Sequence, residues 1–292
     1  MEAQRTDLAC EAHELWQESA EKATQLHGIQ TSEKILEGFR VHRVTVTDDE
    51  AARALGKPKG HYMTVELDSL LRRDEHAFPR AVTALAALLS PILPTDGTAL
   101  VVGLGNRAIT PDLIGPLAAE QTLVTRHLVA QLPDHFGHFR PVAALTPGVL
   151  ATTGLESALL VRAAVAELRP SCVIAVDALV SRSAKRLCRT VQISDSGIVP
   201  GSGVGNHRMA LNTDTLGVPV FSVGVPTIVE ASTLLMDLLG SDVHPDIPHS
   251  DLFVTPREVD SRVADLSRVI GYGISIALNP GLTVEDLDLL LT

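Results

Sequence analysis

Residues 99–106 read Ala-Leu-Val-Val-Gly-Leu-Gly-Asn, an apolar run that ends in glycines and an asparagine. A short continuous apolar run of this kind is typical of a strand buried on both faces of a parallel sheet. Three similar runs follow, at 141–145, 172–176 and 218–223, and helical patterns separate them. Because strand and helix alternate, the sequence predicts an α/β fold: a three-layer sandwich with helices on both faces of a mostly parallel sheet.

The helical patterns have apolar residues at three- and four-residue spacing. They predict helices at 81–89, 113–131, 154–168 and 257–278, and another that starts after Pro226 and ends near Gly240. The start of the long helix at 113–131 is announced by Thr110-Pro111-Asp112, since proline and acidic residues are favoured in a first helical turn. A further short strand is expected at 190–193.

The first 70 residues differ in character from the rest. Residues 1–35 are polar and are expected to be helical in part, whereas 39–47 alternates apolar and polar residues as a strand does. A short helix at 48–55 and a second strand at 61–67 follow, with a glycine- and proline-rich turn between them. This pattern predicts a small α/β insert, or edge subdomain, within residues 36–70 of a single domain that spans 8–292.

Composition limits the classes of function. Of the 292 residues, 45% are hydrophobic and 20% are charged, which is typical of a globular protein. The formal charge of −11 argues against direct binding to nucleic acid. No apolar run reaches the about 18 residues that cross a membrane, and the N-terminus lacks a secretory signal. We therefore expect no membrane association and a cytoplasmic location. Three scattered cysteines suit reduced thiols better than a disulfide framework or zinc site.

Two carboxylates stand where parallel strands are expected to end. Asp177 directly follows the run at 172–176, and Asp112 lies a few residues beyond the run at 99–104. Groups at the carboxyl ends of parallel strands meet at one edge of the sheet. Two buried carboxylates there can share a proton, so that one deprotonates water while the other polarises a peptide carbonyl. Each also has a common structural interpretation, Asp112 as a helix-start carboxylate and Asp177 as a turn former.

Glycine-rich loops flank these carboxylates and are expected to line a substrate cleft, because glycine lets a backbone approach a ligand closely. Tight turns alone would explain the same glycines, and an Asx turn would explain the aspartate that precedes the last loop. The candidate cleft residues are Gly103, Gly105, Asn106, Asp195, Gly201, Gly203 and Gly205.

Other catalytic chemistries find little support. The cluster Asp134-His135-Phe136-Gly137-His138 lacks the spacing of a zinc peptidase, so we assign no metal ligands. The sequence contains no G-x-S-x-G elbow, and no cysteine stands at an evident nucleophile position.

The chain resembles the germination protease family over most of its length. The motifs that carry the resemblance, in chain order, are Arg5-Thr6-Asp7-Leu8-Ala9, Val101 to Asn106 with Thr110-Pro111-Asp112, Thr125-Arg126-His127-Leu128, Thr153-Gly154-Leu155-Glu156, Ile174 to Leu179, Gln192 to Ile198, Pro200 to Asn206 and Val254 to Asp260.

The resemblance implies a fold like that of the hydrogenase-maturation peptidases (phosphorylase/hydrolase-like), and a catalytic pair at Asp112 and Asp177. It implies an endopeptidase that degrades small acid-soluble spore proteins during germination, in the forespore or spore core, and that assembles as a homotetramer. It also implies a zymogen that removes its own propeptide. The family cuts between an acidic and a hydrophobic residue that alanine follows, so cleavage between Asp7 and Leu8 would release residues 1–7. Metal use stays open.

Two departures from the family pattern concern the zymogen and an insert. The segment before Arg5 is shorter than the resemblance leads us to expect, and a stretch before Val254 is reduced to about 241–250.

Two alternative functions remain. Gly-Leu-Gly-Asn also occurs in peptidyl-tRNA hydrolases, esterases that need a histidine after this strand, but none follows here before His127. A non-catalytic binder of spore proteins is the other.

Overall fold

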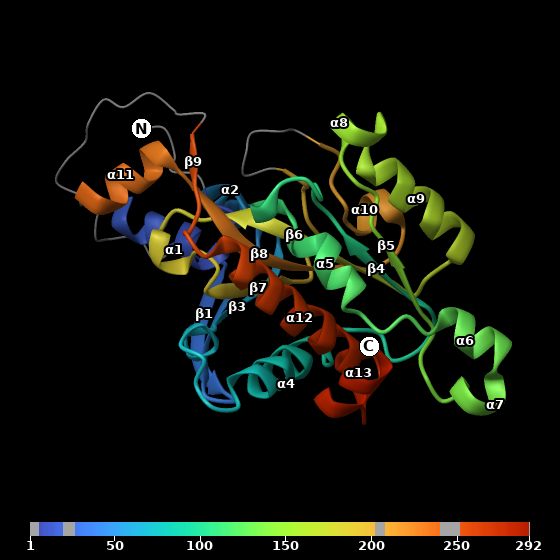
Figure 1. The fold of residues 1–292 in the computed structure, drawn as a ribbon. Helices are drawn as coiled ribbons and strands as arrows, with labels where there is room; N and C mark the ends of the chain where they lie inside the picture. The colour runs from blue at the N-terminus through green and yellow to red at the C-terminus, as the bar shows by residue number, and fades with distance from the viewer. Residues whose placement is uncertain (1–5, 20–26, 202–207, 240–251, 292) are drawn as a thin grey trace.

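A single mixed sheet lies between two layers of helices (Figure 1). This computed structural model describes residues 6–19, 27–201, 208–239 and 252–291. The arrangement confirms the predicted three-layer α/β fold. Among the described helices, none combines the length and apolar character needed to cross a membrane.

Within the described residues the sheet has nine strands, in the order β1-β2-β3-β7-β8-β6-β4-β5, with β9 paired to β8. Their bounds are β1 Ile29–Leu36, β2 Phe39–Val46, β3 Gly60–Glu66, β4 Ala99–Gly103, β5 Val142–Leu145, β6 Cys172–Val180, β7 Thr190–Ser194, β8 Val220–Glu230 and β9 Phe253–Val254. The apolar runs found in the sequence are the strands β4, β5, β6 and β8, which form the half of the sheet that ends in β5.

The sheet is parallel in one half only. Strands β5, β4, β6 and β8 are parallel to one another, whereas β1, β2, β3, β7 and β8 pair antiparallel. The expectation of a mostly parallel sheet therefore holds for the first half. Strand β7 runs opposite to β6 because only residues 181–189 connect them, fewer than the dozen or so that a parallel crossover requires.

The two faces of the sheet carry different helices. On one face pack α4 (Ala77–Leu89), α5 (Ile114–Glu120), α12 (Val259–Leu278) and α13 (Val284–Leu290). On the other, α9 (Ser157–Leu168) and α10 (Thr213–Leu216) cover the parallel half, and α1 (Ala9–Ser19) and α2 (Asp49–Leu55) cover the antiparallel half. The second face thus has two separate apolar clusters, with a boundary between them.

The remaining elements are short or lie at the edges. They are α3 Asp68–Leu71, α6 Arg126–Gln131, α7 Pro133–Phe136, α8 Leu150–Thr153, α11 Ala231–Leu239 and the 3₁₀ turns η1 Thr110–Asp112 and η2 Ala184–Arg186. The expected insert at 36–70 contains β2, α2 and β3, and β3 pairs with β7, so these residues extend the main sheet.

Several expected bounds were wrong. The helix expected at 113–131 is broken into α5 and α6, because the N–H of Leu123 bonds to Ser275 Oγ of α12 (2.9 Å) and that of Thr125 to the Val142 carbonyl (3.1 Å). Strand β8 continues through Pro226 instead of ending before it. The missing N–H is tolerated there because the pairing with β6 shifts register one residue later.

Candidate active site

The parallel half of the sheet has a point where the connections diverge. From β4 the chain goes to β5 on one side, and from β6 it goes by way of β7 to β8 on the other. The crevice outside the carboxyl ends of such a strand pair is where α/β proteins bind ligands. Asp112 and Asp177 both lie at this crevice between β4 and β6, as the sequence predicted.

Asp177 lies within β6, which continues to Val180, so the expectation that it follows the strand was wrong. Its side chain is only 6% exposed, and its Oδ1 accepts a hydrogen bond from the Ala178 N–H at 2.9 Å. Alternate residues of β6 face opposite sides of the sheet. Asp177 therefore shares a face with Ala175 and Leu179, which belong to the two apolar clusters of that face. It sits at the boundary between these clusters.

Asp112 is held in η1 by the backbone that leaves β4. Its Oδ2 accepts a hydrogen bond from the Asn106 N–H at 2.6 Å. Gly105 has a φ of 131°, and a Cβ there would lie 2.0 Å from the Asp112 carbonyl oxygen. The Leu104 N–H donates to the Val176 carbonyl (2.8 Å), which ties this turn to β6. Only a glycine at 105 lets the turn bring Asp112 beside Asp177.

The two carboxyl groups influence each other's ionisation. Burial raises the pKa of Asp177 well above its ordinary value, and the charge of Asp112 raises that pKa further. Burial also raises the pKa of Asp112, while the Asn106 N–H and the Arg208 charge oppose that rise. Two such groups bind a shared proton more tightly than either would alone. Because Asp177 is the more buried, it is the group that holds this proton.

The N-terminal segment enters the same site. The Asp7 N–H donates to the Val180 carbonyl at 2.9 Å, and the Val180 N–H donates to Asp7 Oδ2 at 2.9 Å. The negative charge of Asp7 also contributes to the raised pKa of Asp177. Leu8 and Ala9 are wholly buried. The N-terminal segment is therefore bound at the end of β6, and the charge of Asp7 acts on Asp177.

Gln192 of β7 holds this peptide from both sides, and the sequence reasoning did not single it out. Its Nε2 donates to the Asp7 carbonyl at 3.1 Å, and its Oε1 accepts from the Ala9 N–H at 2.7 Å. In the sheet, Gln192 pairs with Gly224 and Gly224 pairs with Asp177. Two strand spacings place Gln192 about 10 Å from Asp177 on the same face. The sequence signal that could have pointed to Gln192 is its place in the motif Gln192 to Ile198, which is one of those that carry the family resemblance.

The other candidate cleft residues have mixed placements. Asp195 Oδ1 accepts the His61 N–H at 2.7 Å, so this aspartate joins the start of β3 to the end of β7. A Cβ at Gly103 would lie 2.2 Å from the Gly115 carbonyl, so Gly103 permits close packing of α5 on β4. Gly201 adopts a φ of 69°. Gly203 and Gly205 lie outside the described residues.

A family model described as germination protease matches residues 9–242. The chain belongs to the germination protease family. It is 38% identical to a germination protease of Caldanaerobacter subterraneus, over 98% of each chain, and 37% identical to one of Clostridium perfringens, over 97% of this chain and 98% of that one. A Bacillus cereus germination protease is 42% identical over 80% of this chain and 65% of its own length.

A solved structure is also similar in part. A [NiFe] hydrogenase maturation protease, HycI from Thermococcus kodakarensis, matches with a TM-score of 0.35 and 17% identity, over 64% of this chain and 98% of that one. Membership of the germination protease family makes the chain a peptidase. Among the described residues, no group of three or more His, Cys, Asp or Glu side chains is arranged to hold a metal ion.

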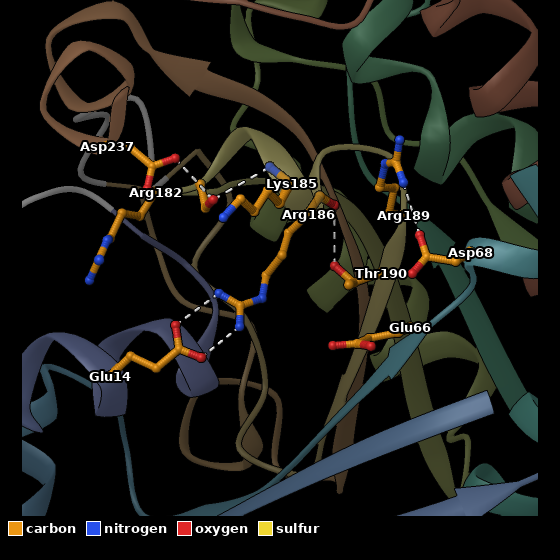
Figure 2. Close-up of a pocket in the computed structure, with 10 residues that line it drawn as sticks. Glu14, Glu66, Asp68, Arg182, Lys185, Arg186, Arg189, Thr190 and Asp237 are labelled. Atoms are coloured by element: carbon orange, nitrogen blue, oxygen red, sulfur yellow. Dashed lines mark hydrogen bonds and ion pairs between the residues drawn. The ribbon is translucent and has the colours of Figure 1, made fainter. Parts of the chain in front are cut away.

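A separate charged cavity of about 370 Å³ lies beside the loop that follows β6 (Figure 2). Its lining includes four basic and four acidic side chains. Arg186 forms an ion pair with Glu14 of α1 at 2.6 Å, and Arg189 pairs with Asp68 at 3.0 Å. Because these charges are paired, the cavity is less suited to a substrate than the crevice at Asp177. Its contacts instead fasten α1 to the loop.

Proposed function

We propose that this member of the germination protease family is an endopeptidase that begins the degradation of small acid-soluble spore proteins during germination, and that it is made as a self-processing zymogen. One observation carries the proposal: Gln192 and the end of β6 bind the backbone around the Asp7–Leu8 bond, and the charge of Asp7 acts on Asp177. The acidic-apolar-alanine sequence at this bond is the pattern that the family resemblance implies for cleavage.

The geometry supports a mechanism in which the two carboxyl groups have different roles. Asp112, the more exposed, accepts a proton from water, and the hydroxide attacks the Asp7 carbonyl carbon. Asp177, which holds the shared proton, donates it to the carbonyl oxygen as the tetrahedral intermediate forms. The proton on Asp112 then passes to the Leu8 nitrogen and the C–N bond breaks, while the protonated oxygen returns its proton to Asp177. The products are the Asp7 α-carboxylic acid, which ionises, and the Leu8 amine, which takes up a proton.

The wider setting follows from the same family membership. We propose that the processed enzyme acts in the spore core as a homotetramer on spore proteins, and that it binds neither nucleic acid nor membrane directly. Size-exclusion chromatography with light scattering tests the tetramer. A mass of about 31 kDa for the purified chain, which is that of one subunit, would contradict it.

Self-processing tests the central proposal directly. The purified chain is incubated at mildly acidic pH and followed by intact-mass spectrometry. We expect loss of residues 1–7 in the wild type and no loss in Asp177→Asn or Asp112→Asn. Asp134→Asn changes an exposed aspartate on α7 in the same way and should process normally. The expected trans activity is cleavage of an added small acid-soluble spore protein.

Other outcomes point to other functions. A wild-type chain that binds spore proteins with fixed stoichiometry but never cuts them would be a binder. Normal processing in the double variant Asp112→Asn/Asp177→Asn would remove the aspartate pair from the mechanism. Loss of wild-type cleavage after treatment with a chelator, restored by adding one metal, would establish metal dependence.

A further inference from the structure

The N-terminal segment is bound as an extended peptide, through its backbone rather than through its own helix. The Thr6 carbonyl accepts from Lys57 Nζ at 3.1 Å, and the Asp7 N–H donates to the Val180 carbonyl at 2.9 Å. The Asp7 carbonyl and the Ala9 N–H both bond to Gln192. These backbone groups are present in every polypeptide. A second peptide could therefore make the same bonds in the same place.

Gln192 acts like the edge of a neighbouring strand. The backbone of β7 is already paired on both sides, with β3 and β8, so the side-chain amide alone is left to bond a peptide on this face. It offers one donor and one acceptor, spaced to meet the carbonyl of the cut bond and the N–H of the second residue after it. Gln192 is only 7% exposed. Its amide is bonded to Asp7 and Ala9, and the backbone of a substrate offers the same two groups.

The side chains of the segment meet distinct surroundings. The Asp7 carboxylate accepts from the Val180 N–H, and the charges of Asp7 and Lys57 attract each other. Leu8 is wholly buried in an apolar cluster that includes Tyr62 and Leu179. Ala9 is wholly buried as well, which leaves no space for a larger side chain. The surroundings therefore select an acidic residue, then an apolar one, then a small one.

We propose that Gln192, Lys57 and the Val180 N–H form the substrate-binding cleft for protein substrates, and that the docked N-terminal segment shows how a substrate lies. This inference rests on the proposed peptidase function. It assigns the specificity-determining residues: Gln192 binds the backbone on both sides of the cut bond, and Lys57 selects the acidic residue before it. A substrate is an extended peptide that takes the place of residues 6–9.

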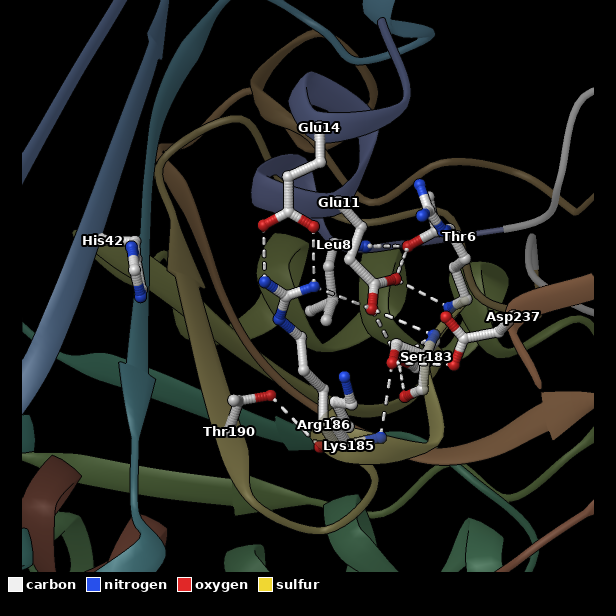
Figure 3. Close-up of polar contacts among 12 residues, drawn as sticks. Thr6, Leu8, Glu11, Glu14, His42, Ser183, Lys185, Arg186, Thr190 and Asp237 are labelled. Carbon is white, nitrogen blue, oxygen red and sulfur yellow. Dashed lines mark hydrogen bonds and ion pairs between the residues drawn. The ribbon is translucent and has the colours of Figure 1, made fainter. Parts of the chain in front are cut away.

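Occupation by a substrate requires helix α1 to leave its place. Glu11 of α1 is wholly buried and accepts hydrogen bonds from Ser181 Oγ (2.8 Å), the Arg182 N–H (2.7 Å) and the Ser183 N–H (3.2 Å). Figure 3 shows this carboxylate between Thr6 and the loop that carries Ser183 and Arg186. Cleft and helix are therefore coupled: while Glu11 is docked, residues 6–9 exclude a second peptide.

A backbone-ester peptide tests the role of Gln192. The probe has the sequence of residues 4–12 with serine for Cys10, and its partner carries an ester in place of the Leu8–Ala9 amide, which removes the Ala9 N–H. In processed wild-type enzyme, the ester peptide should have a roughly tenfold lower kcat/KM, the effect of losing one hydrogen bond. In Gln192→Ala the two peptides should be cut at rates within about twofold of each other.

The control is Gln131→Ala, which changes an exposed glutamine of α6 and should keep the tenfold ratio. If Gln192→Ala does not fold or process, Gln192→Asn replaces it, because its amide is one methylene too short to reach both groups. A tenfold ratio that persists in both Gln192 variants would overturn the assignment and leave the proposed function standing. Failure of wild type to cut either peptide would instead reject the proposed function itself.

A peptide series tests Lys57 in the same way. Changing aspartate to asparagine before the cut bond should lower kcat/KM in wild type by roughly tenfold, since the attraction between the carboxylate and the Lys57 charge is lost. In Lys57→Met the penalty should shrink to about twofold, whereas the exposed-lysine control Lys34→Met should keep it. A general loss of activity in Lys57→Met that leaves the penalty unchanged would show a structural role only.

Discussion

Replacing Glu11 by glutamine should release helix α1 from the body of the protein. The two carboxylate oxygens each accept a backbone hydrogen bond: Oε2 from the Arg182 N–H and Oε1 from the Ser183 N–H. A glutamine amide has the same shape but only one oxygen. In one orientation its NH₂ group faces the Arg182 N–H, which then has no acceptor. In the other it faces the Ser183 N–H, which keeps only its 3.2 Å hydrogen bond to Ser181 Oγ. The substitution therefore changes hydrogen bonding without creating a cavity.

The size of the effect can be worked out from these contacts. A buried N–H without an acceptor costs about 1–3 kcal/mol. Arg186 loses its 3.2 Å contact with the Glu11 charge but keeps its pair with Glu14, a loss of about 1 kcal/mol. The sum, about 2–4 kcal/mol, raises the open population of α1 by roughly thirtyfold to several hundredfold.

Hydrogen exchange followed by mass spectrometry measures this opening at residues 9–19. Exchange there should accelerate by the factor given above, while the core strands β4 and β6 keep their protection. Glu14→Gln is the matched control, because Glu14 lies on the same helix, pairs with the same arginine and is 42% exposed. It should raise exchange only a few-fold. Equal acceleration in the two variants would refute the argument that buried N–H groups hold the helix.

Three further predictions concern single residues. Burial raises the pKa of Asp177, so its contribution to stability is full below the unfolded-state pKa of about 3.9 and is lost as pH rises through the raised folded-state pKa. The melting temperature of Asp177→Asn should therefore match that of the wild type near pH 4 and exceed it near pH 8. Parallel curves of melting temperature against pH for the two proteins would contradict this. Gly105→Ala, with a φ of 131° and an overlapping Cβ, should lower the free energy of unfolding by more than about 2 kcal/mol in urea titrations, whereas Gly154→Ala, at φ 71° with open space around it, should cost about 1 kcal/mol. Burial raises the pKa of the Cys10 thiol to about 11, so this thiol should react slowly with a thiol reagent at pH 8 in the wild type. It should react faster in Glu11→Gln, in which α1 opens more often. Equal reaction rates in the two proteins would show that α1 stays docked.

The central strands and the aspartate pair were predictable because their signals are local. A buried parallel strand needs an unbroken apolar run, and the rule on strand ends then places Asp112 and Asp177 at one edge without any knowledge of other contacts. The length of β6 beyond Asp177 was not predictable in this way. It depends on pairing with β8 across a register shift, which the sequence of β6 alone does not reveal.

Features made by distant contacts escaped the sequence reasoning. Gln192 acts on a peptide bond 185 residues earlier in the chain, and no spacing rule links them. Strand β1 has six exposed residues in a row, so it lacks the alternation that marks a half-buried strand. The break between α5 and α6 depends on Ser275 of α12, which caps an N–H that a continuous helix would have used.

The burial of Leu8 has a consequence for the direction of the reaction. Hydrolysis of the Asp7–Leu8 bond turns one neutral amide into a carboxylate on the partly buried Asp7 and an ammonium group on the wholly buried Leu8. Keeping each new ion away from water costs several kcal/mol. Hydration of the new charges therefore favours the movement of both cut ends into solvent. Rejoining the ends would require both charges to lose their hydration again. The processing proposed for this chain should therefore be irreversible, because the folded protein opposes the reverse reaction.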